Sequence, residues 1–293
     1  MSKVWHWLYS CPAPIRALVC LGGSVVLAAP IAVPLYRYEY AATQGKSVIW
    51  APLCLFLAFC WLLPRWLRWV HQCRQPGLAM GLRGGNRWGR SWAAAFLIGV
   101  SGVGALYALQ LLLGWGVWSP PAASTLGRSL LEGGLVGLGV GFAEELIFRG
   151  WLLFELEQDY APPVALGLNA VIFAIAHYLR PLAVILETWP QFIGLLLLGV
   201  TLGWARRIPQ APQGRSPAPQ TTLAAAAGLH GGLVFAYYQV DVNDLILPVA
   251  GIPPWWVGVG GNPLAGGLGL GLLSLMAAWA YRASRPGRSP SGR

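Results

Sequence analysis

Two adjacent glutamates, Glu144 and Glu145, lie in a strongly apolar stretch of the sequence, and Arg149 follows four residues later. An ionised side chain at the centre of a lipid-embedded helix costs about 2.5–3.5 kcal/mol on insertion scales. The whole chain has only 10 acidic residues, so a pair of them in such a stretch indicates a functional site. Carboxylates shielded from water suit general-base chemistry, because nearby charges tune their affinity for a proton.

Helical spacing predicts different roles for the two carboxylates. Glu145 and Arg149 are four residues apart, so they share one helix face and can form an ion pair. Glu144 is rotated away from that face and has no partner on its own helix. We therefore expect a structural or orienting ion pair beside a carboxylate that carries the chemistry.

The next apolar segment holds Asn169, Phe173 and His177, which recur every four residues along one stripe of a helix. If the two segments form an antiparallel hairpin that turns at 159–162, Glu144 and His177 lie at the same depth. Each is then roughly 22–25 Å along its helix from the turn, at 1.5 Å per residue. The sequence therefore predicts that these two side chains meet.

A further histidine, His230, lies near the start of a later apolar segment. Gly231 and Gly232 follow it directly, and they would let a backbone or a substrate approach closely. A single histidine in such a segment can also be a helix-packing donor, so both interpretations of His230 stay open.

The motifs Glu-Glu-x-x-x-Arg at 144–149 and Phe-x-x-x-His at 173–177, with a later histidine, resemble the CPBP family of intramembrane proteases. That family includes type II CAAX prenyl proteases and proteins once labelled abortive infection proteins. The resemblance covers about residues 125–240 and implies an eight-helix, CAAX-protease-like bundle. It implies that Glu144 and His177 activate a water, that Glu145 and Arg149 orient and charge-balance the site, and that His230 polarises the carbonyl.

The third family motif, His-x-x-x-Asn or a similar polar ending, is incomplete because position 234 is Val. Loss of one oxyanion donor typically lowers a rate by about 10²–10³-fold. Asn169 or Asn262 are candidate replacements. Asn169 and Phe173 are also the candidate substrate-binding residues. The alternative role of Asn169 is a helix–helix hydrogen bond, and that of Phe173 is packing of its ring around the site.

Composition predicts the elements that must position these residues. The chain of 293 residues is 56% hydrophobic and 10% charged, with a mean hydropathy of +0.56, whereas soluble domains carry about 25% charge. We expect an all-α polytopic membrane protein, a single membrane domain over 1–293 with about eight transmembrane helices of roughly 20 residues each. The predicted spans are about 16–35, 47–63, 92–115, 129–157, 162–179, 183–204, 221–240 and 264–282.

The net charge of +10 does not predict nucleic-acid binding, because the basic residues accompany no base-reading motif. Most of them fall in loops on one side of the predicted spans, which fits the positive-inside rule and contact with anionic lipids. We expect an integral protein of a bacterial-type plasma membrane or a plastid membrane, with both termini on the cytoplasmic or stromal side.

Three functions compete. The first is an endopeptidase whose substrate is a hydrophobic protein or peptide, with or without a prenyl group. The second is a catalytically weak or inactive scaffold or regulator of the same family, which Val234 favours, and the third is a proton-coupled transporter. For the endopeptidase we expect metal-independent chemistry. Zn²⁺ is the alternative cofactor, and its ligands would be Glu144, His177 and His230.

Overall fold

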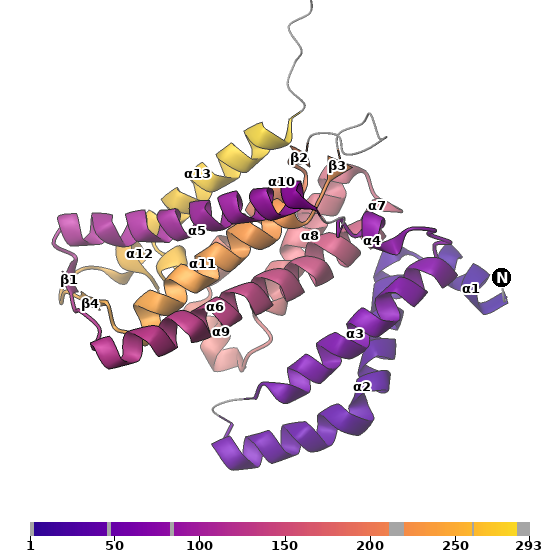
Figure 1. The fold of residues 1–293 in the computed structure, drawn as a ribbon, viewed down its shortest axis with the longest axis horizontal. Helices are drawn as coiled ribbons and strands as arrows, with labels where there is room; N and C mark the ends of the chain where they lie inside the picture. The colour runs from indigo at the N-terminus through magenta and orange to yellow at the C-terminus, as the bar shows by residue number, and fades with distance from the viewer. Residues whose placement is uncertain (1–2, 46–47, 83–84, 211–219, 260, 286–293) are drawn as a thin grey trace, which may run out of the picture. The chain divides into compact units, whose positions relative to one another are not determined.

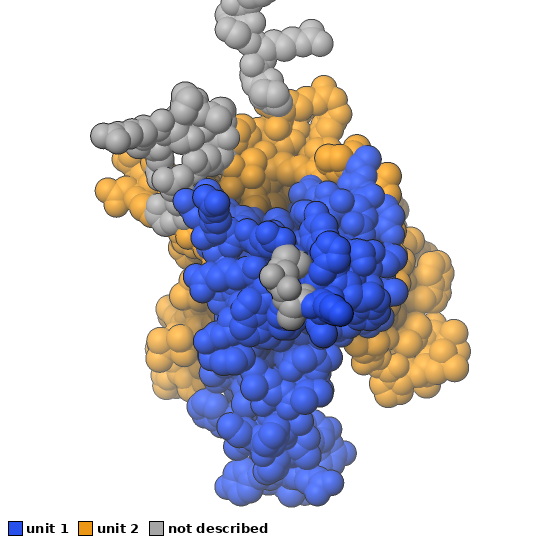
Figure 2. Space-filling model, turned by 90° about the vertical axis from the view of Figure 1, so that its right-hand side faces the viewer, with its two compact units in different colours: residues 1–80, 151–161 blue, residues 81–150, 162–293 orange. Residues whose placement is uncertain are grey.

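The computed structural model describes residues 3–45, 48–82, 85–210, 220–259 and 261–285, and most of them are helical. The predicted all-α class is therefore confirmed. The chain divides into two compact units (Figure 2). Unit 1 comprises 1–80 and 151–161, and unit 2 comprises 81–150 and 162–293.

Unit 1 is built on two long helices, α2 (Ala13–Thr43) and α3 (Trp50–Trp69), which pack against each other (Figure 1). The carboxylate of Glu39 accepts hydrogen bonds from the first backbone N–H groups of α3, at 2.7 Å from Ile49 and 2.8 Å from Trp50. It thus satisfies donors that have no partner within the helix. The shorter helices are α1 (Lys3–Ser10), α4 (Pro76–Ala79) and α7 (Leu153–Glu157).

A buried polar network ties these helices together inside unit 1. The fully buried Glu155 carboxylate of α7 lies 2.9 Å from Arg16 Nε and accepts from Trp66 Nε1 at 2.6 Å. His71 Nε2 lies 2.8 Å from the same carboxylate. Arg16 therefore contributes to the packing of this unit through its contacts with Glu155.

Unit 2 is organised around α11 (Ala224–Val242), which packs against α5 (Asn86–Leu112) and α6 (Ala123–Glu145) (Figure 1). The helix α10 (Gln191–Arg206) packs against α11, α8 (Pro162–Ala176) and α13 (Gly267–Ser284). The remaining elements are α9 (Leu182–Thr188), α12 (Pro254–Val257), η2 (Pro263–Ala265), the antiparallel strands β1 (Gly116–Trp118) and β4 (Ile246–Pro248), and the antiparallel strands β2 (Pro209–Gln210) and β3 (Gln220–Thr221).

Glycines allow α11 to lie this close to its neighbours. A Cβ added at Gly232 would collide with the backbone carbonyl oxygen of Phe96 on α5. On the other side, a Cβ at Gly141 of α6 would lie 2.6 Å from the Cα of Gly231. The two glycines that follow His230 therefore allow the backbones of neighbouring helices to approach α11. The sequence left open whether a backbone or a substrate would approach them.

The helical run that carries the glutamates changes its winding directly after them. α6 ends at Glu145, and a π-helix, η1 (Leu146–Leu152), continues the chain into α7. A π-helix bonds each residue to one five positions away, and such segments are frequent at functional sites.

Among the described helices, α2, α3 and α5 are long and apolar enough to cross a membrane. The pair α9 and α10, bent by 79°, could add a fourth crossing as one broken span. The bend lies at Trp189-Pro190 inside the predicted span 183–204, where Pro190 interrupts the helix. The chain is an integral membrane protein, and the eight spans and the single membrane domain stay predictions.

Candidate active site

The predicted catalytic residues all lie in unit 2. Glu144 and Glu145 are the last two residues of α6, and Arg149 lies in η1. His177 directly follows α8, and His230 lies on α11. Segments far apart in the sequence thus bring their polar side chains to one place.

The predicted meeting of Glu144 and His177 is confirmed. His177 Nε2 lies 3.4 Å from Glu144 Oε2, and His230 Nε2 lies 3.9 Å from the same oxygen. The Glu144 and His177 side chains are each 27% exposed, whereas the Glu144 Oε2 atom itself is buried. The carboxylate and the two imidazoles therefore converge on one buried oxygen within a partly exposed group of side chains.

Hydrogen bonds fix which nitrogen of each histidine carries a proton in the neutral ring. His177 Nδ1 lies 2.8 Å from the Phe173 carbonyl oxygen, and His230 Nδ1 lies 3.0 Å from Glu145 Oε1. Since a carbonyl and an ionised carboxylate only accept, both Nδ1 atoms donate. Both Nε2 atoms then turn lone pairs towards Glu144 Oε2, which accepts no hydrogen bond from the described residues. Three acceptors around one point suit a water molecule or a proton.

The predicted ion pair of Glu145 and Arg149 is also confirmed, with Arg149 Nη1 at 2.8 Å from Glu145 Oε1 and both side chains fully buried. Arg149 Nη2 also donates to the carbonyl oxygen of Gly199 on α10, at 3.1 Å. Glu145 Oε1 thus lies next to both Arg149 and His230, which links the ion pair to the imidazole.

Asn169 and Phe173 form the wall behind this pair. Asn169 Nδ2 donates to the Phe148 carbonyl oxygen at 2.7 Å. The fully buried Phe173 ring lies 4.2 Å from Arg149 Cζ and 4.4 Å from the His177 ring centroid. These contacts support the site from within the protein, and the substrate-binding role of both residues stays a prediction.

The described contacts show no donor that replaces the polar side chain missing from the third motif. Val234, one turn after His230 on α11, has an apolar side chain without a hydrogen-bond donor. The Asn169 amide is engaged with Phe148, and the Asn262 side-chain oxygen accepts from Leu264 N at 3.0 Å, where it caps η2.

The donor set does not form a metal site as it stands. Within the described residues, no group of three or more His, Cys, Asp or Glu side chains is arranged to hold a metal ion. We therefore derive no step through a metal, and Zn²⁺ at Glu144, His177 and His230 stays an untested alternative.

Three features that support the site residues could not be predicted from the sequence. The Gly199 carbonyl, the Phe148 carbonyl and the π-helical winding of η1 all hold site residues in place. A backbone carbonyl leaves no signal in the residue type, because every residue has one. The two carbonyls could be found only from three-dimensional packing.

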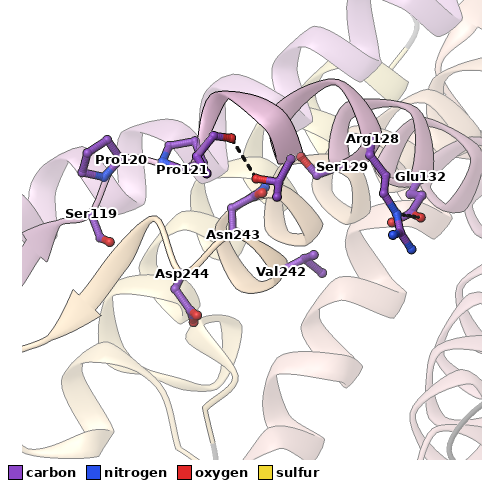
Figure 3. A pocket seen from close by; sticks show the side chains of 11 residues that line it. Ser119, Pro120, Pro121, Arg128, Ser129, Glu132, Val242, Asn243 and Asp244 are labelled. Carbon is purple, nitrogen blue, oxygen red and sulfur yellow. Dashed lines mark hydrogen bonds and ion pairs between the residues drawn. The ribbon is translucent and has the colours of Figure 1, made fainter.

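A pocket of about 460 Å³ lies elsewhere in unit 2, where α6 begins and α11 ends (Figure 3). Arg128 and Glu132 line it and form an exposed ion pair of 2.6 Å. Tyr238 also donates to Glu132, at 3.1 Å. None of the predicted site residues lines this pocket. The pocket is therefore separate from the carboxylate–histidine centre, despite its size.

The fold and the site together define the class of protein. It is an integral membrane protein in which a carboxylate–histidine centre lies next to a buried ion pair. Residues 126–231 match the family model described as type II CAAX prenyl endopeptidase Rce1-like. The matched segment includes Glu144, Glu145, Arg149, His177 and His230, and it confirms the resemblance to the CPBP family. The match supports a CAAX-protease-like function at the level of the family. No curated protein and no solved structure matches the chain.

Proposed function

We propose that the protein is an intramembrane endopeptidase that hydrolyses a peptide bond next to a hydrophobic or lipidated segment. The observation that carries this proposal is the convergence of Glu144 Oε2 with the Nε2 atoms of His177 and His230, at 3.4 and 3.9 Å. The family match supports the class of reaction.

Glu144 and His177 act on the attacking water. The water donates one hydrogen to the Glu144 carboxylate or to His177 Nε2 as its oxygen attacks the peptide carbonyl carbon. The same proton then passes to the leaving nitrogen as the C–N bond breaks, so the products are a carboxylic acid and an amine. The Phe173 carbonyl holds His177 Nδ1–H and thereby stabilises the imidazolium form that exists between the two transfers.

His230 acts on the substrate carbonyl. Glu145 accepts from His230 Nδ1, which orients the ring so that Nε2 faces Glu144 Oε2. When a proton is on Nε2, this nitrogen can donate to the oxyanion that forms during the attack. Arg149 balances the charge of Glu145, which keeps this orientation fixed in a buried place.

The proposed substrate is a hydrophobic membrane protein or peptide, with or without a prenyl group. An apolar segment of such a substrate would remain in the lipid while the bond beside it reaches Glu144. Both termini of the enzyme are proposed to lie on the cytoplasmic or stromal side, in keeping with the positive-inside rule.

The test compares membranes that contain wild-type protein with membranes that contain the Glu144→Ala variant. New protein termini and uncut precursors are measured by mass spectrometry. We expect precursors to accumulate with Glu144→Ala and not with Glu187→Gln, which removes an exposed carboxylate of α9 outside the site. Identical sets of termini for wild type and Glu144→Ala would refute the proposal.

A second candidate, an inactive scaffold or regulator of the same family, is favoured by Val234 alone. It predicts that Glu144→Gln folds normally and leaves the cellular phenotype of the wild type unchanged. The endopeptidase predicts instead that this variant reproduces the phenotype of a deletion.

A further inference from the structure

An aromatic and acidic pocket of about 360 Å³ lies where α5 and α11 end, next to β4 and the segment that follows it. Its lining includes three aromatic side chains, two carboxylates and an amide, from Tyr107, Gln110, Trp115, Tyr237, Asp241 and Asp244. Asp241 is eleven residues after His230 on α11, which places it about 16 Å along the helix at 1.5 Å per residue. The pocket is therefore distinct from the carboxylate–histidine centre.

The pocket has the chemistry of a cation site. Carboxylates attract a positive charge, and the faces of Tyr and Trp rings attract an ammonium group within about 6 Å. The described part of the chain contributes no Lys or Arg to this lining. Tyr237 donates to Asp241 at 3.3 Å and lies 3.2 Å from the Gly261 carbonyl oxygen, so one ring and one carboxylate are held together.

Gln110 adds an independent sign of a ligand. Its side chain is 5% exposed, and its amide nitrogen is buried without a hydrogen-bond partner among the described residues. A buried donor left unsatisfied costs about 1–3 kcal/mol and is uncommon in proteins. A ligand with an oxygen acceptor near its ammonium group would satisfy this donor.

An apolar pocket, also of about 360 Å³, adjoins the first one. The two pockets share Tyr107, Val240 and Ile246. Its other lining residues are mostly aliphatic or aromatic, including Val103 and Phe235. A single ligand that fills both pockets would have a cationic head group and a hydrocarbon chain.

We infer that these two pockets form a binding site for an amine-headed phospholipid. The ammonium of the head group lies among the rings and the carboxylates, a phosphate or ester oxygen accepts from Gln110, and part of one acyl chain fills the apolar pocket. Charge complementarity selects an ethanolamine-type or choline-type head group over an anionic one. The inference does not depend on peptide hydrolysis, because it uses none of the residues of the carboxylate–histidine centre.

The test measures lipid binding to the purified full-length protein by native mass spectrometry. The probes are phosphatidylethanolamine, phosphatidylglycerol with the same acyl chains, and phosphoethanolamine without chains. We expect wild type to bind phosphatidylethanolamine at least about tenfold more tightly than phosphatidylglycerol. The double variant Asp241→Asn, Asp244→Asn loses this preference, whereas Glu187→Gln keeps it.

A second pair of variants tests the chain pocket. Gly104 lines the apolar pocket, and a Cβ added there meets no described atom within 4 Å. Gly104→Leu should therefore fill the pocket without moving the backbone and weaken phosphatidylethanolamine binding. The control Gly139→Leu also adds its Cβ in open space, on α6 and outside the pocket, and should bind as wild type does.

Three results would overturn the inference. One is equal affinity of wild type for the two phospholipids, and another is an unchanged preference in the double Asp variant. The third is binding of phosphoethanolamine as tight as that of the whole lipid, which would indicate a free amine as the ligand. Tyr237→Phe, which removes a single hydroxyl group, serves as the milder variant if the double Asp variant does not fold. It should weaken the preference for the amine head group, and an unchanged preference in that variant would also contradict the site.

Discussion

Glu144 and Glu145 are neighbours in the chain but lie in different surroundings, with side chains 27% and 0% exposed. Glu144 faces two imidazole nitrogens that lack hydrogens in their neutral form, whereas Glu145 is paired with Arg149 and His230. The first arrangement can take up a proton from water, and the second can only hold its partners. Burial thus separates the carboxylate that we propose to react from the one that we propose to position its neighbours.

The buried ion pair should be needed for folding. Arg149→Met leaves the Glu145 charge without its partner, and breaking a buried pair in this way typically costs about 3–5 kcal/mol. We expect a marked drop in thermal stability of the detergent-purified protein. The control is Arg128→Met, which breaks an exposed pair whose Arg side chain is 78% exposed, and exposed pairs contribute about 0–1 kcal/mol. Equal stability losses in the two variants would contradict the structural role of Arg149.

The apolar side chain at position 234 should limit the rate. Val234→Asn introduces a donor one helical turn from His230, and a second oxyanion donor is worth about 10²–10³-fold in turnover. We expect faster cleavage of the precursors that accumulate with Glu144→Ala, measured as initial rates in proteoliposomes. An unchanged rate in a folded Val234→Asn protein would mean that the oxyanion is held in another way.

At the scale of elements, the site depends on how closely α6 and α11 approach each other. Gly141 and Gly231 face each other across this contact, and Glu144 follows Gly141 by less than one turn of the same helix. The π-helix η1 begins directly after the glutamates and sets where Arg149 lies. The position of Glu144 relative to His230 therefore depends on this helix contact.

A methyl group at this contact should disturb the site. The Cβ of Gly141→Ala would lie 2.6 Å from backbone atoms of Gly231, so the helices must move apart at a cost of about 1–3 kcal/mol. We expect lower thermal stability and lower turnover. The matched control Gly139→Ala, two residues earlier on α6, places its Cβ where no described atom lies within 4 Å, and it should keep both. Wild-type behaviour of Gly141→Ala would show that the contact is looser than the structure indicates.

Much of the site follows from periodicity in the sequence. The four-residue spacing gave the pair of Glu145 and Arg149, and equal distance from a turn gave the contact of Glu144 with His177. The π-helix η1 could not be predicted, because its winding depends on packing rather than on the residue pattern. The break between α9 and α10 coincides with Pro190, but its angle of 79° could not be predicted from the sequence. The contact of His230 with Glu145 was also missed, since no spacing rule relates helices so far apart in the sequence.

At the scale of the whole molecule, the protein is helical and carries few charges, and the fully buried carboxylates of the described residues lie beside partners. In unit 1 the fully buried Glu155 contacts Arg16, Trp66 and His71, and in unit 2 Glu145 contacts Arg149 and His230. Buried charges require partners. Each unit thus has its own polar centre. Both centres also include a partly exposed carboxylate, Asp159 beside Arg16 in unit 1 and Glu144 beside His177 in unit 2.

The positive-inside rule predicts the orientation of the whole chain. Both termini should lie on the cytoplasmic or stromal side, because the loops on that side hold most of the basic residues. Reporter fusions at the N-terminus and at the C-terminus, each active only in the cytoplasm, should both be active in a bacterial host. Activity at one end only would require an odd number of spans and would contradict the predicted eight.

The central claim is that Glu144 and His177 activate a water that cleaves a peptide bond. The most direct measurement incubates wild-type and Glu144→Gln proteoliposomes with an identified precursor in ¹⁸O-labelled water and follows the new C-terminus by mass spectrometry. We expect wild type to produce a carboxylate labelled with ¹⁸O, and a rate at least about 10²-fold lower for Glu144→Gln, which keeps the shape of the side chain and loses the base. Equal rates for the two proteins would contradict the account.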